Sequence, residues 1–155
     1  MRFSIMKRIQ LLLTLLLFVS ISNSQTGSLQ ITVTGIQSTR GDIKIALYNE
    51  SGKLGFLKSL DTAYKKKIGK IINLKTTVSF ENIPYGIYAV ALFHDENLNS
   101  ELDRAALGYP IEAYGVSGNV QTVGPPRYED CKFEMKSSFK KLDIKLQTWL
   151  KKKQP

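Results

Sequence analysis

The strongest candidate for chemistry is an acidic segment that runs from Asp95 to Asp103. Side chains that carry oxygen occupy every second position in it, namely Asp95, Asn97, Asn99, Glu101 and Asp103. Calcium binds six to eight oxygen ligands, and alternating carboxylates and amides on a curled loop can supply several of them. The spacing therefore predicts a calcium site, with a weak dissociation constant of roughly 0.1–1 mM, as in extracellular modules.

The same segment departs from a helix-flanked calcium loop, and the departures favour a second interpretation. Ser100 stands where glycine normally makes the sharp turn, and Ala106 stands where a bidentate carboxylate normally completes the site. The alternative is a turn rich in Asn and Asp, whose side chains bond the backbone of the loop itself. The sequence leaves both interpretations open, and in the first the ion would mainly stabilise the loop.

Four residues near this segment are candidates for ligand binding: His94, Tyr114, Tyr128 and Glu129. The tyrosines lie in a stretch rich in glycine and proline, where they could stack on a sugar, contact a partner or close one end of a β-sandwich. His94 follows an apolar run and is either a ligand or a hydrogen-bonded residue at the edge of the core. No motif places a serine or cysteine to complete a triad with it, so no catalytic residue is predicted.

An enzyme that acts on glycans is the alternative function. Asp95, Asp103 and Glu129 could serve as its carboxylates if two of them face each other at roughly 5–10 Å across a cleft. Cys131 is the single cysteine, so no disulfide forms within the chain. It lies in an alternating run that predicts the buried side of a strand, where a thiol acts as a small hydrophobic residue.

The elements that position these residues are predicted to be β-strands, because apolar and polar residues alternate along much of the chain. Strands are predicted at 29–34, 43–47, 72–80, 87–93, 131–135 and 142–146. The first two flank a short turn with glycine and predict a hairpin, and 87–93 is apolar on both faces, which predicts a covered central strand. The stretch 51–69 is expected to be a loop with a helical turn. Residues 142–150 also fit one face of a helix.

About seven short strands without a dividing linker predict one antiparallel two-sheet β-sandwich of an immunoglobulin-like kind. The turn and strand Pro84–Val90 also resemble those of transthyretin-like modules, which implies the same kind of sandwich. Residues 94–130 are expected to form a long loop, and loops of this length are commonly functional. Two lysine runs, at 65–67 and 151–153, could attract nucleic acid or an anionic membrane, or could be a solvated loop and a solvated tail. No nucleic-acid motif accompanies them, so no nucleic-acid partner is expected.

Residues 1–24 have the composition of a cleavable signal peptide. A positive start precedes the apolar run 11–19, and small residues at 22–24 provide a cleavage site before Gln25. The alternative is a permanent membrane anchor, but the apolar run is shorter than the roughly 20 residues that span a bilayer. Cleavage would leave one domain, 25–155, with a formal net charge of +6 instead of +9 and no transmembrane segment. The sequence thus predicts a periplasmic or secreted protein.

Six segments carry a family resemblance: Asn82–Val90, His94–Asn99, Leu102–Asp103, Leu107–Pro110, Glu112–Ser117 and Gly124–Asp130. They resemble the bacterial domain-of-unknown-function family 2141, which is an exported family. The resemblance covers essentially the whole chain after residue 24 and implies a small exported β-sandwich with no established catalytic residue. Family members tend to have glycine where this chain has Leu98 and Ser100. Those two residues are expected to strain the curl of the loop and to weaken its calcium site.

Together these features predict an exported, non-enzymatic binding or structural module of the cell envelope, with 94–130 as its working surface. The expected partner is an envelope protein or a glycan, and calcium is the one cofactor that the sequence suggests. A purely structural subunit, docking through a strand edge or the basic tail, is a further possibility.

Overall fold

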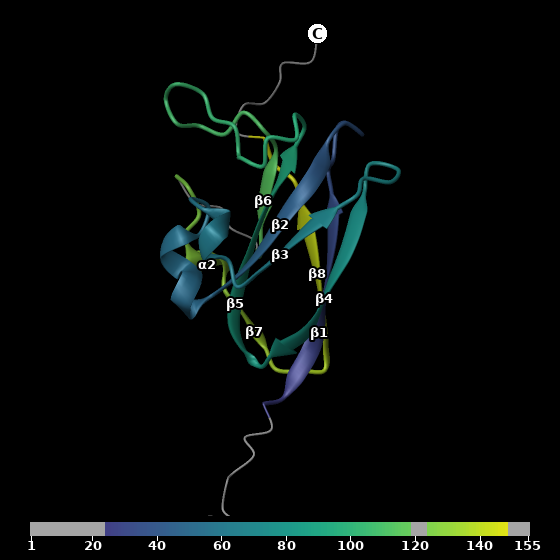
Figure 1. Ribbon diagram of the computed structural model, residues 1–155, viewed down its shortest axis with the longest axis vertical. Coiled ribbons are helices and arrows are strands. Elements are labelled where there is room, and N and C mark those ends of the chain that lie inside the picture. The colour runs from purple at the N-terminus through teal and green to yellow at the C-terminus, as the bar shows by residue number, and fades with distance from the viewer. Residues whose placement is uncertain (1–23, 119–123, 149–155) are drawn as a thin grey trace, which may run out of the picture.

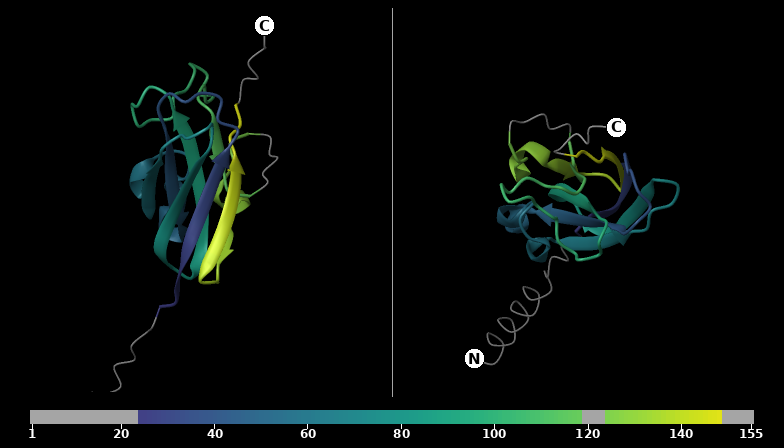
Figure 2. Two further views of the ribbon diagram at one scale, coloured as in Figure 1. Left: turned by 90° about the vertical axis from the view of Figure 1, so that its right-hand side faces the viewer. Right: turned by 90° about the horizontal axis from the view of Figure 1, so that it is seen from above.

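The computed structural model describes residues 24–118 and 124–148, which form two β-sheets packed face to face (Figure 1 and Figure 2). The three-stranded sheet has the order β4-β1-β8, and the five-stranded sheet has the order β3-β2-β5-β6, with β7 also paired to β5. The strands are β1 (Thr26–Thr34), β2 (Asp42–Asn49), β3 (Lys65–Gly69), β4 (Thr76–Pro84), β5 (Gly86–Asp95), β6 (Tyr114–Val116), β7 (Phe133–Met135) and β8 (Phe139–Lys145). Short helices in the described ranges accompany them: η1 (Glu50–Gly55), η2 (Leu60–Thr62) and α2 (Tyr128–Cys131). The predicted all-β, two-sheet architecture is confirmed.

The main core lies between the two sheets. Alternate residues of each strand point into it, and the side chains of Ile31 and Val33 on β1 and of Ile43 on β2 are fully buried. Residues of β5 and β8, such as Leu92 and Ile144, complete the same cluster. This burial of apolar surface supplies the main stabilisation of the fold, at roughly 25 cal/mol per Å² removed from water.

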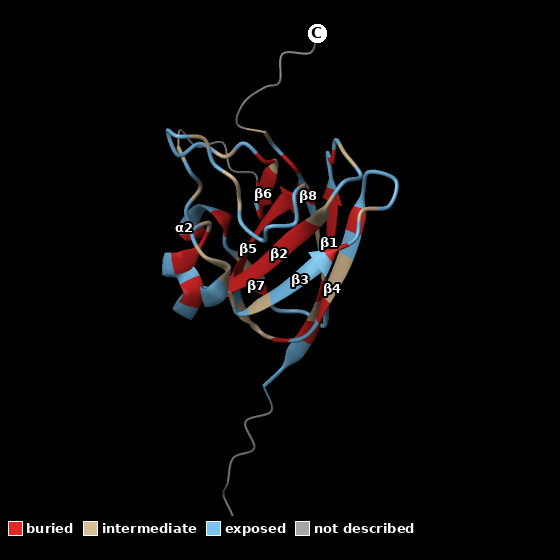
Figure 3. Ribbon diagram, turned by 45° about the horizontal axis from the view of Figure 1, so that its top comes forward, coloured by how far each residue is buried: buried red, intermediate tan, exposed pale blue. Residues whose placement is uncertain are grey.

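A second hydrophobic cluster lies on the outer face of the five-stranded sheet. Small residues of β2 and β5, including Ala46, Ala89 and Ala91, form its base, and the rings of Phe56 and Tyr128 pack over them. Strand β5 is therefore covered on both faces, as its apolar sequence predicts. Figure 3 shows β2 and β5 buried along their length and β3 exposed at the edge.

The predicted hairpin between the first two strands is wrong. Strand β1 pairs with β4 and β8, whereas β2 pairs with β3 and β5, so consecutive strands lie in opposite sheets. Alternation cannot separate the two arrangements, because either one buries one face of each strand in the same core. Gly41 makes the crossover possible: its φ is +69°, and a Cβ there would lie 1.9 Å from the carbonyl oxygen of Asp95. The β1–β8 pair is parallel, an exception to the predicted antiparallel pattern.

Two other strand predictions need correction around the lysine run. Lys65–Lys67, expected in a loop, belong to edge strand β3, where charged side chains discourage pairing with another molecule. Residues 72–75 form a tight turn instead of the start of a strand, with Asn73 and Leu74 at positive φ, and β4 begins at Thr76. Helices η1 and η2 replace the single helical turn expected in 51–69.

The last part of the chain is mostly as predicted. Residues 139–145 form strand β8, so the strand interpretation holds for this part of 142–150. Cys131 is buried as expected, but at the end of α2 instead of in a strand, and burial raises the pKa of its thiol to about 12. Within 94–130, the structure places strand β6 in the five-stranded sheet.

Some predictions fall on residues that the structure does not describe. The signal peptide, apart from Ser24, and the lysine run 151–153 lie outside the described residues. Among the helices in the described part of the chain, none has the length and apolar character needed to span a membrane.

Candidate functional site

Asp95 is a buried anchor of the acidic loop. It is the last residue of β5 and is fully buried, and its carboxylate accepts the backbone N–H groups of Asn99 (3.0 Å) and Ser100 (2.9 Å). The Nζ of Lys44, on the adjacent strand β2, lies 3.3 Å from Asp95 and 3.1 Å from the carboxylate of Asp42. Burial lowers the pKa of Lys44, but hydrogen bonds to these two carboxylates outweigh it, so the pKa is raised. A buried lysine thus neutralises Asp95.

The amide side chains of the loop converge on Asp103. Asn97 and Asn99 donate through their Nδ2 atoms to the two carboxylate oxygens of Asp103, at 2.8 and 2.9 Å. The Oδ1 atoms of Asn97 and Asn99 accept the backbone N–H groups of Asn99 and Glu101, while the Glu101 side chain is exposed. Four of the five predicted ligands therefore come together, in the self-bonded turn that the second interpretation describes.

Calcium binding by this loop stays a prediction. In the ranges 24–118 and 124–148, no three His, Cys, Asp or Glu side chains gather in a group that could hold a metal ion. The loop is strained as the missing glycines suggest, since Leu98 (φ 62°) and Ser100 (φ 65°) both adopt the left-handed conformation that favours glycine.

Glu112 closes the acidic loop and was not predicted as a site residue. Its buried carboxylate accepts the backbone N–H groups of Glu96 (3.0 Å) and Asp103 (3.1 Å), which brings the two ends of the loop together. Burial raises the pKa of Glu112, although the two backbone hydrogen bonds oppose this effect. A lone acidic residue nine positions after Asp103 carries no spacing signal, so the residue pattern could not reveal this role.

His94 lies in the core and lines neither pocket described below. It is 1% exposed, and its Nε2 lies 2.7 Å from the carbonyl oxygen of Arg40, which matches the structural alternative for this residue. Glu129, on α2, is exposed and pairs with Lys132 at 2.6 Å. The structure does not bring Asp95, Asp103 and Glu129 together around either pocket, as the glycan-hydrolysing alternative would require.

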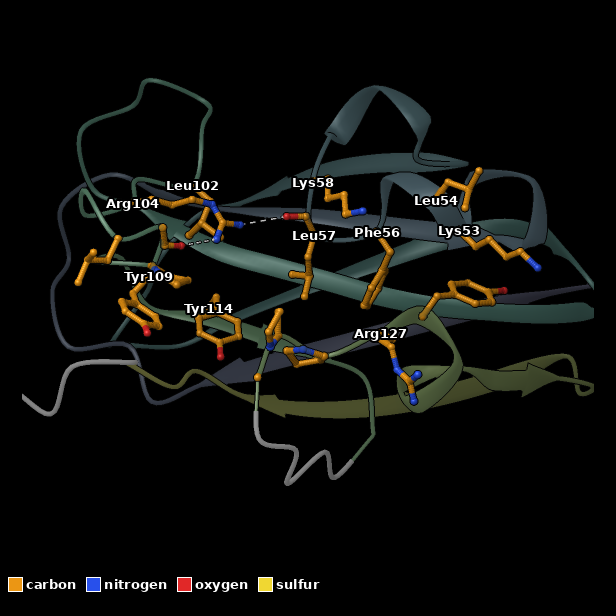
Figure 4. A pocket seen from close by; sticks show the side chains of 17 residues that line it. Lys53, Leu54, Phe56, Leu57, Lys58, Leu102, Arg104, Tyr109, Tyr114 and Arg127 are labelled. Carbon is orange, nitrogen blue, oxygen red and sulfur yellow. Dashed lines mark hydrogen bonds between the residues drawn. The ribbon is translucent and has the colours of Figure 1, made fainter.

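An apolar pocket of about 1070 Å³ opens beside the second hydrophobic cluster (Figure 4). We call it the aromatic pocket. Three segments line it, with one residue of β6: Lys53, Leu54, Phe56, Leu57, Lys58, Leu102, Arg104, Leu107, Gly108, Tyr109, Pro110, Tyr114, Gly124, Pro125, Pro126, Arg127 and Tyr128. Of the predicted ligand-binding residues, Tyr114 and Tyr128 meet here. The sequence did not single out Phe56, Leu57 or Arg104, because distant segments supply them.

The floor of the aromatic pocket is fixed by ring packing. Phe56 packs edge-to-face against Tyr48 and Tyr128, with ring centroids 5.3 and 6.1 Å apart. The Tyr128 hydroxyl donates to the carbonyl oxygen of Ile87 at 3.2 Å, which holds the ring in place. Edge-to-face aromatic pairs of this kind give a preformed, largely apolar surface of the sort that small-molecule sites use.

Arg104 joins two walls of the aromatic pocket. Its Nη1 donates to the carbonyl oxygen of Gly108 (3.0 Å) and its Nη2 to that of Leu57 (3.1 Å). Leu57 adopts a φ of 60°, which costs a residue with a side chain roughly 1–2 kcal/mol relative to ordinary backbone. A second pocket of about 610 Å³ shares Leu57, Lys58, Leu102 and Arg104 with the first and is also lined by Asp61, Lys66 and Glu101.

Comparison with known proteins identifies the family. A model of DUF2141, described as an uncharacterized protein conserved in bacteria, matches residues 31–143. The chain belongs to this family. The resemblance seen in the sequence is thus confirmed, and the matched region of this DUF2141 protein includes both the acidic loop and the aromatic pocket.

The chain was also compared with curated proteins and with solved structures. A search of curated proteins gives no significant match to this DUF2141 chain. Among solved structures, the chain is similar to a fimbrial assembly protein from Parabacteroides distasonis ATCC 8503, with 10% sequence identity and a TM-score of 0.42. The similarity covers 80% of this chain and 53% of that protein, so the chain spans about half of its length.

Proposed function

We propose that this DUF2141 protein is a non-catalytic ligand-binding module of the bacterial cell envelope or exterior, and that the aromatic pocket is its binding site. The observation that carries the proposal is the rigid floor of Phe56 and Tyr128 beneath an open, mainly apolar cavity. Concave sites with fixed apolar walls and a few polar groups are the usual form of small-molecule binding sites. Two of the residues predicted for ligand binding, Tyr114 and Tyr128, line this cavity.

The chemistry of the lining supports binding instead of catalysis. No Asp, Glu, His, Cys, Ser or Thr is among the described residues that line the aromatic pocket. These are the residue types most often used for acid–base and nucleophilic catalysis, and the described lining offers only Lys and Tyr side chains for such roles. The cationic side chains Lys58 and Arg104 are instead suited to holding a charged ligand. Export of the module rests on the signal-like composition of residues 1–24.

Blocking the pocket tests the proposed function. The probe is N-phenyl-1-naphthylamine, an uncharged dye whose fluorescence rises in apolar surroundings, and the variant is Leu102→Trp, which places a larger side chain in the lining. We expect the wild-type protein to bind the dye and the variant to bind it at least about fivefold more weakly, because the added ring occupies the cavity.

Leu74→Trp is the matched control, since Leu74 is an exposed leucine in a turn that does not line the pocket. Thermal unfolding of both variants shows whether they remain folded. Equal dye binding by wild type and Leu102→Trp, or no dye binding by the wild type, would contradict the proposal.

A second proposal concerns weak calcium binding by the acidic loop. The observation that favours it is the convergence of Asn97 and Asn99 on the Asp103 carboxylate, which gathers three oxygen-bearing side chains within one turn. The amide groups would have to rotate so that their oxygens face the ion. Asp95 is committed to Lys44 and to backbone N–H groups, so one carboxylate fewer is left and the affinity should be weak, with a dissociation constant of roughly 0.1–1 mM.

Thermal unfolding with and without calcium tests this second proposal. At about 5 mM calcium, binding with a dissociation constant near 0.5 mM adds about 1.4 kcal/mol to the free energy of unfolding, which raises the melting temperature by a few degrees relative to chelator. The rise should vanish in Asp103→Asn and persist in Asp61→Asn, which removes an exposed carboxylate outside the loop. An unchanged melting temperature in the wild type would contradict calcium binding.

A further inference from the structure

The cationic side chains of the aromatic pocket are not equally neutralised. Among the residues that the structure describes, four of them line it and no carboxylate does. Lys53 forms an ion pair with Glu50, and Arg127 forms one with Asp130 at 3.0 Å, so these two charges are balanced by acidic residues outside the lining. The other two, Lys58 and Arg104, have no carboxylate partner in the described part of the chain. Positive charge is therefore left over at Lys58 and Arg104.

Arg104 is held in place by bonds that do not cancel its charge. Its two hydrogen bonds go to the carbonyl oxygens of Leu57 and Gly108. A guanidinium group has five N–H donors, so three remain for a ligand, and the two fixed bonds reduce the side-chain entropy that a ligand would have to remove. Figure 4 shows Arg104 and Tyr114 toward one end of the pocket and Lys53 and Arg127 toward the other.

Tyr114 adds a hydroxyl donor at the same end. Its ring is buried in the lining, yet its hydroxyl has no hydrogen-bond partner among the described residues. Burial raises the pKa of this phenol, and the nearby charge of Arg104 opposes that effect. Figure 4 places both residues toward this end of the pocket, with the Tyr114 hydroxyl pointing away from the guanidinium.

Apolar surface extends from this polar end. Figure 4 shows Leu57 and Phe56 between Arg104 and Arg127, and Pro125, Pro126 and Tyr128 also contribute to the lining. Leu54 and Leu107 are part of the same lining, and both side chains are 83% exposed. Exposed leucines next to an apolar cavity mark a surface that a ligand can cover.

We propose that the aromatic pocket binds an amphiphile with a single acidic head group and an apolar body. The head group binds to Arg104, and the body packs over Leu57 and Phe56. This assignment rests on the proposed binding function and adds the chemical class of the ligand. The smaller pocket is also lined by Lys58, Lys66 and Arg104, but Asp61 and Glu101 lie among them. Since these carboxylates partly balance the cations, and Lys66 pairs with Asp61, less positive charge is left for an anion there.

Isothermal titration calorimetry with two single-chain probes tests the head-group assignment. The probes are dodecanoate and dodecan-1-ol, used below the concentration at which either aggregates, so that they share the apolar chain and differ in charge. We expect the wild-type protein to bind dodecanoate about fivefold more tightly than dodecanol. A charge-assisted hydrogen bond in a buried site would give a larger ratio, but Arg104 is solvent-exposed, which weakens the effect.

The Arg104→Gln variant should reduce this preference to less than about twofold, while Arg104→Lys should retain part of it. Lys70→Gln is the control, because it removes one exposed positive charge that does not line the pocket. Its preference should stay at the wild-type value. Thermal unfolding of each variant confirms that it is folded.

The possible failures are distinguishable. Equal binding of dodecanoate and dodecanol by the wild type, or a preference that survives in Arg104→Gln, would overturn the head-group assignment and leave the binding function in place. Binding of neither probe, together with no binding of the uncharged dye, would overturn both proposals.

Discussion

The acidic loop and the aromatic pocket differ in what folding leaves available. In the loop, the carboxylates of Asp95 and Glu112 are used by backbone N–H groups, and the Asn97 amide is used by its neighbours. In the pocket, Arg104 keeps free donors and the Tyr114 hydroxyl has no partner in the described part of the chain. The loop has more polar atoms that could contact a ligand, but most of them already form hydrogen bonds within the loop. The pocket has fewer polar groups, and more of these can still bind a ligand. Binding capacity depends on the groups that the fold does not consume.

The largest expected effect concerns the anchor of the loop. Asp95→Ala should lower the free energy of unfolding by about 3–5 kcal/mol, because it leaves Lys44 buried with one carboxylate fewer and removes the acceptor of two backbone N–H groups. Asp103→Ala, which breaks bonds to two exposed amides, should cost about 1–2 kcal/mol. Urea unfolding measures both. Equal losses in the two variants would show that Asp95 does not anchor the loop.

A smaller effect concerns the strain in the same loop. Replacing Leu98 and Ser100 together by glycine should raise the free energy of unfolding by roughly 1 kcal/mol, because both residues adopt positive φ and glycine does so without steric cost. Dye binding in the aromatic pocket should not change, since neither residue lines it. Urea unfolding and dye titration of the double variant check the two statements. A lower free energy of unfolding in the double variant would contradict the strain in the loop. A change in dye affinity would contradict the independence of the loop and the pocket.

The smallest effect is a dependence on pH that comes from Glu112. Its pKa is raised in the folded protein, so the folded state binds the proton more tightly than the unfolded state does. The contribution of Glu112 to stability is therefore fully present below the unfolded value near 4.5 and is lost as the pH rises through the folded pKa. In Glu112→Gln this part of the decline should be absent. Urea unfolding between about pH 4 and pH 7 measures how the free energy of unfolding changes with pH in the wild type and in Glu112→Gln. An identical change with pH in both proteins would contradict the prediction.

The sequence was informative where a pattern reports on one strand at a time. Alternation located β1, β2 and β8, and the two-sided apolar run of β5 predicted a central strand. The pairing of strands could not be predicted from the same pattern. Strands β1 and β2 bury one face each whether they form a hairpin or lie in opposite sheets. The turn at Asn73 and Leu74 was missed since its apolar residues continue the alternation of the following strand.

The candidate sites show the same limit. A local spacing rule singled out the acidic loop, because its oxygen-bearing side chains are neighbours in the sequence. The aromatic pocket joins Phe56, Arg104 and Tyr128 from three separate segments, so no local rule could assemble it. Tyr114 and Tyr128 were predicted individually, from the composition of their surroundings, but the fold was needed to bring them together.

Nuclear magnetic resonance of the backbone amides during a dodecanoate titration tests the central claim most directly, because it observes both regions in one experiment. The account predicts that the amide signals of Leu57, Arg104 and Tyr114 shift with a common saturating dependence on ligand, while those of Asn97 and Asn99 stay in place. Shifts confined to the acidic loop, or to residues that do not line the aromatic pocket, would contradict it.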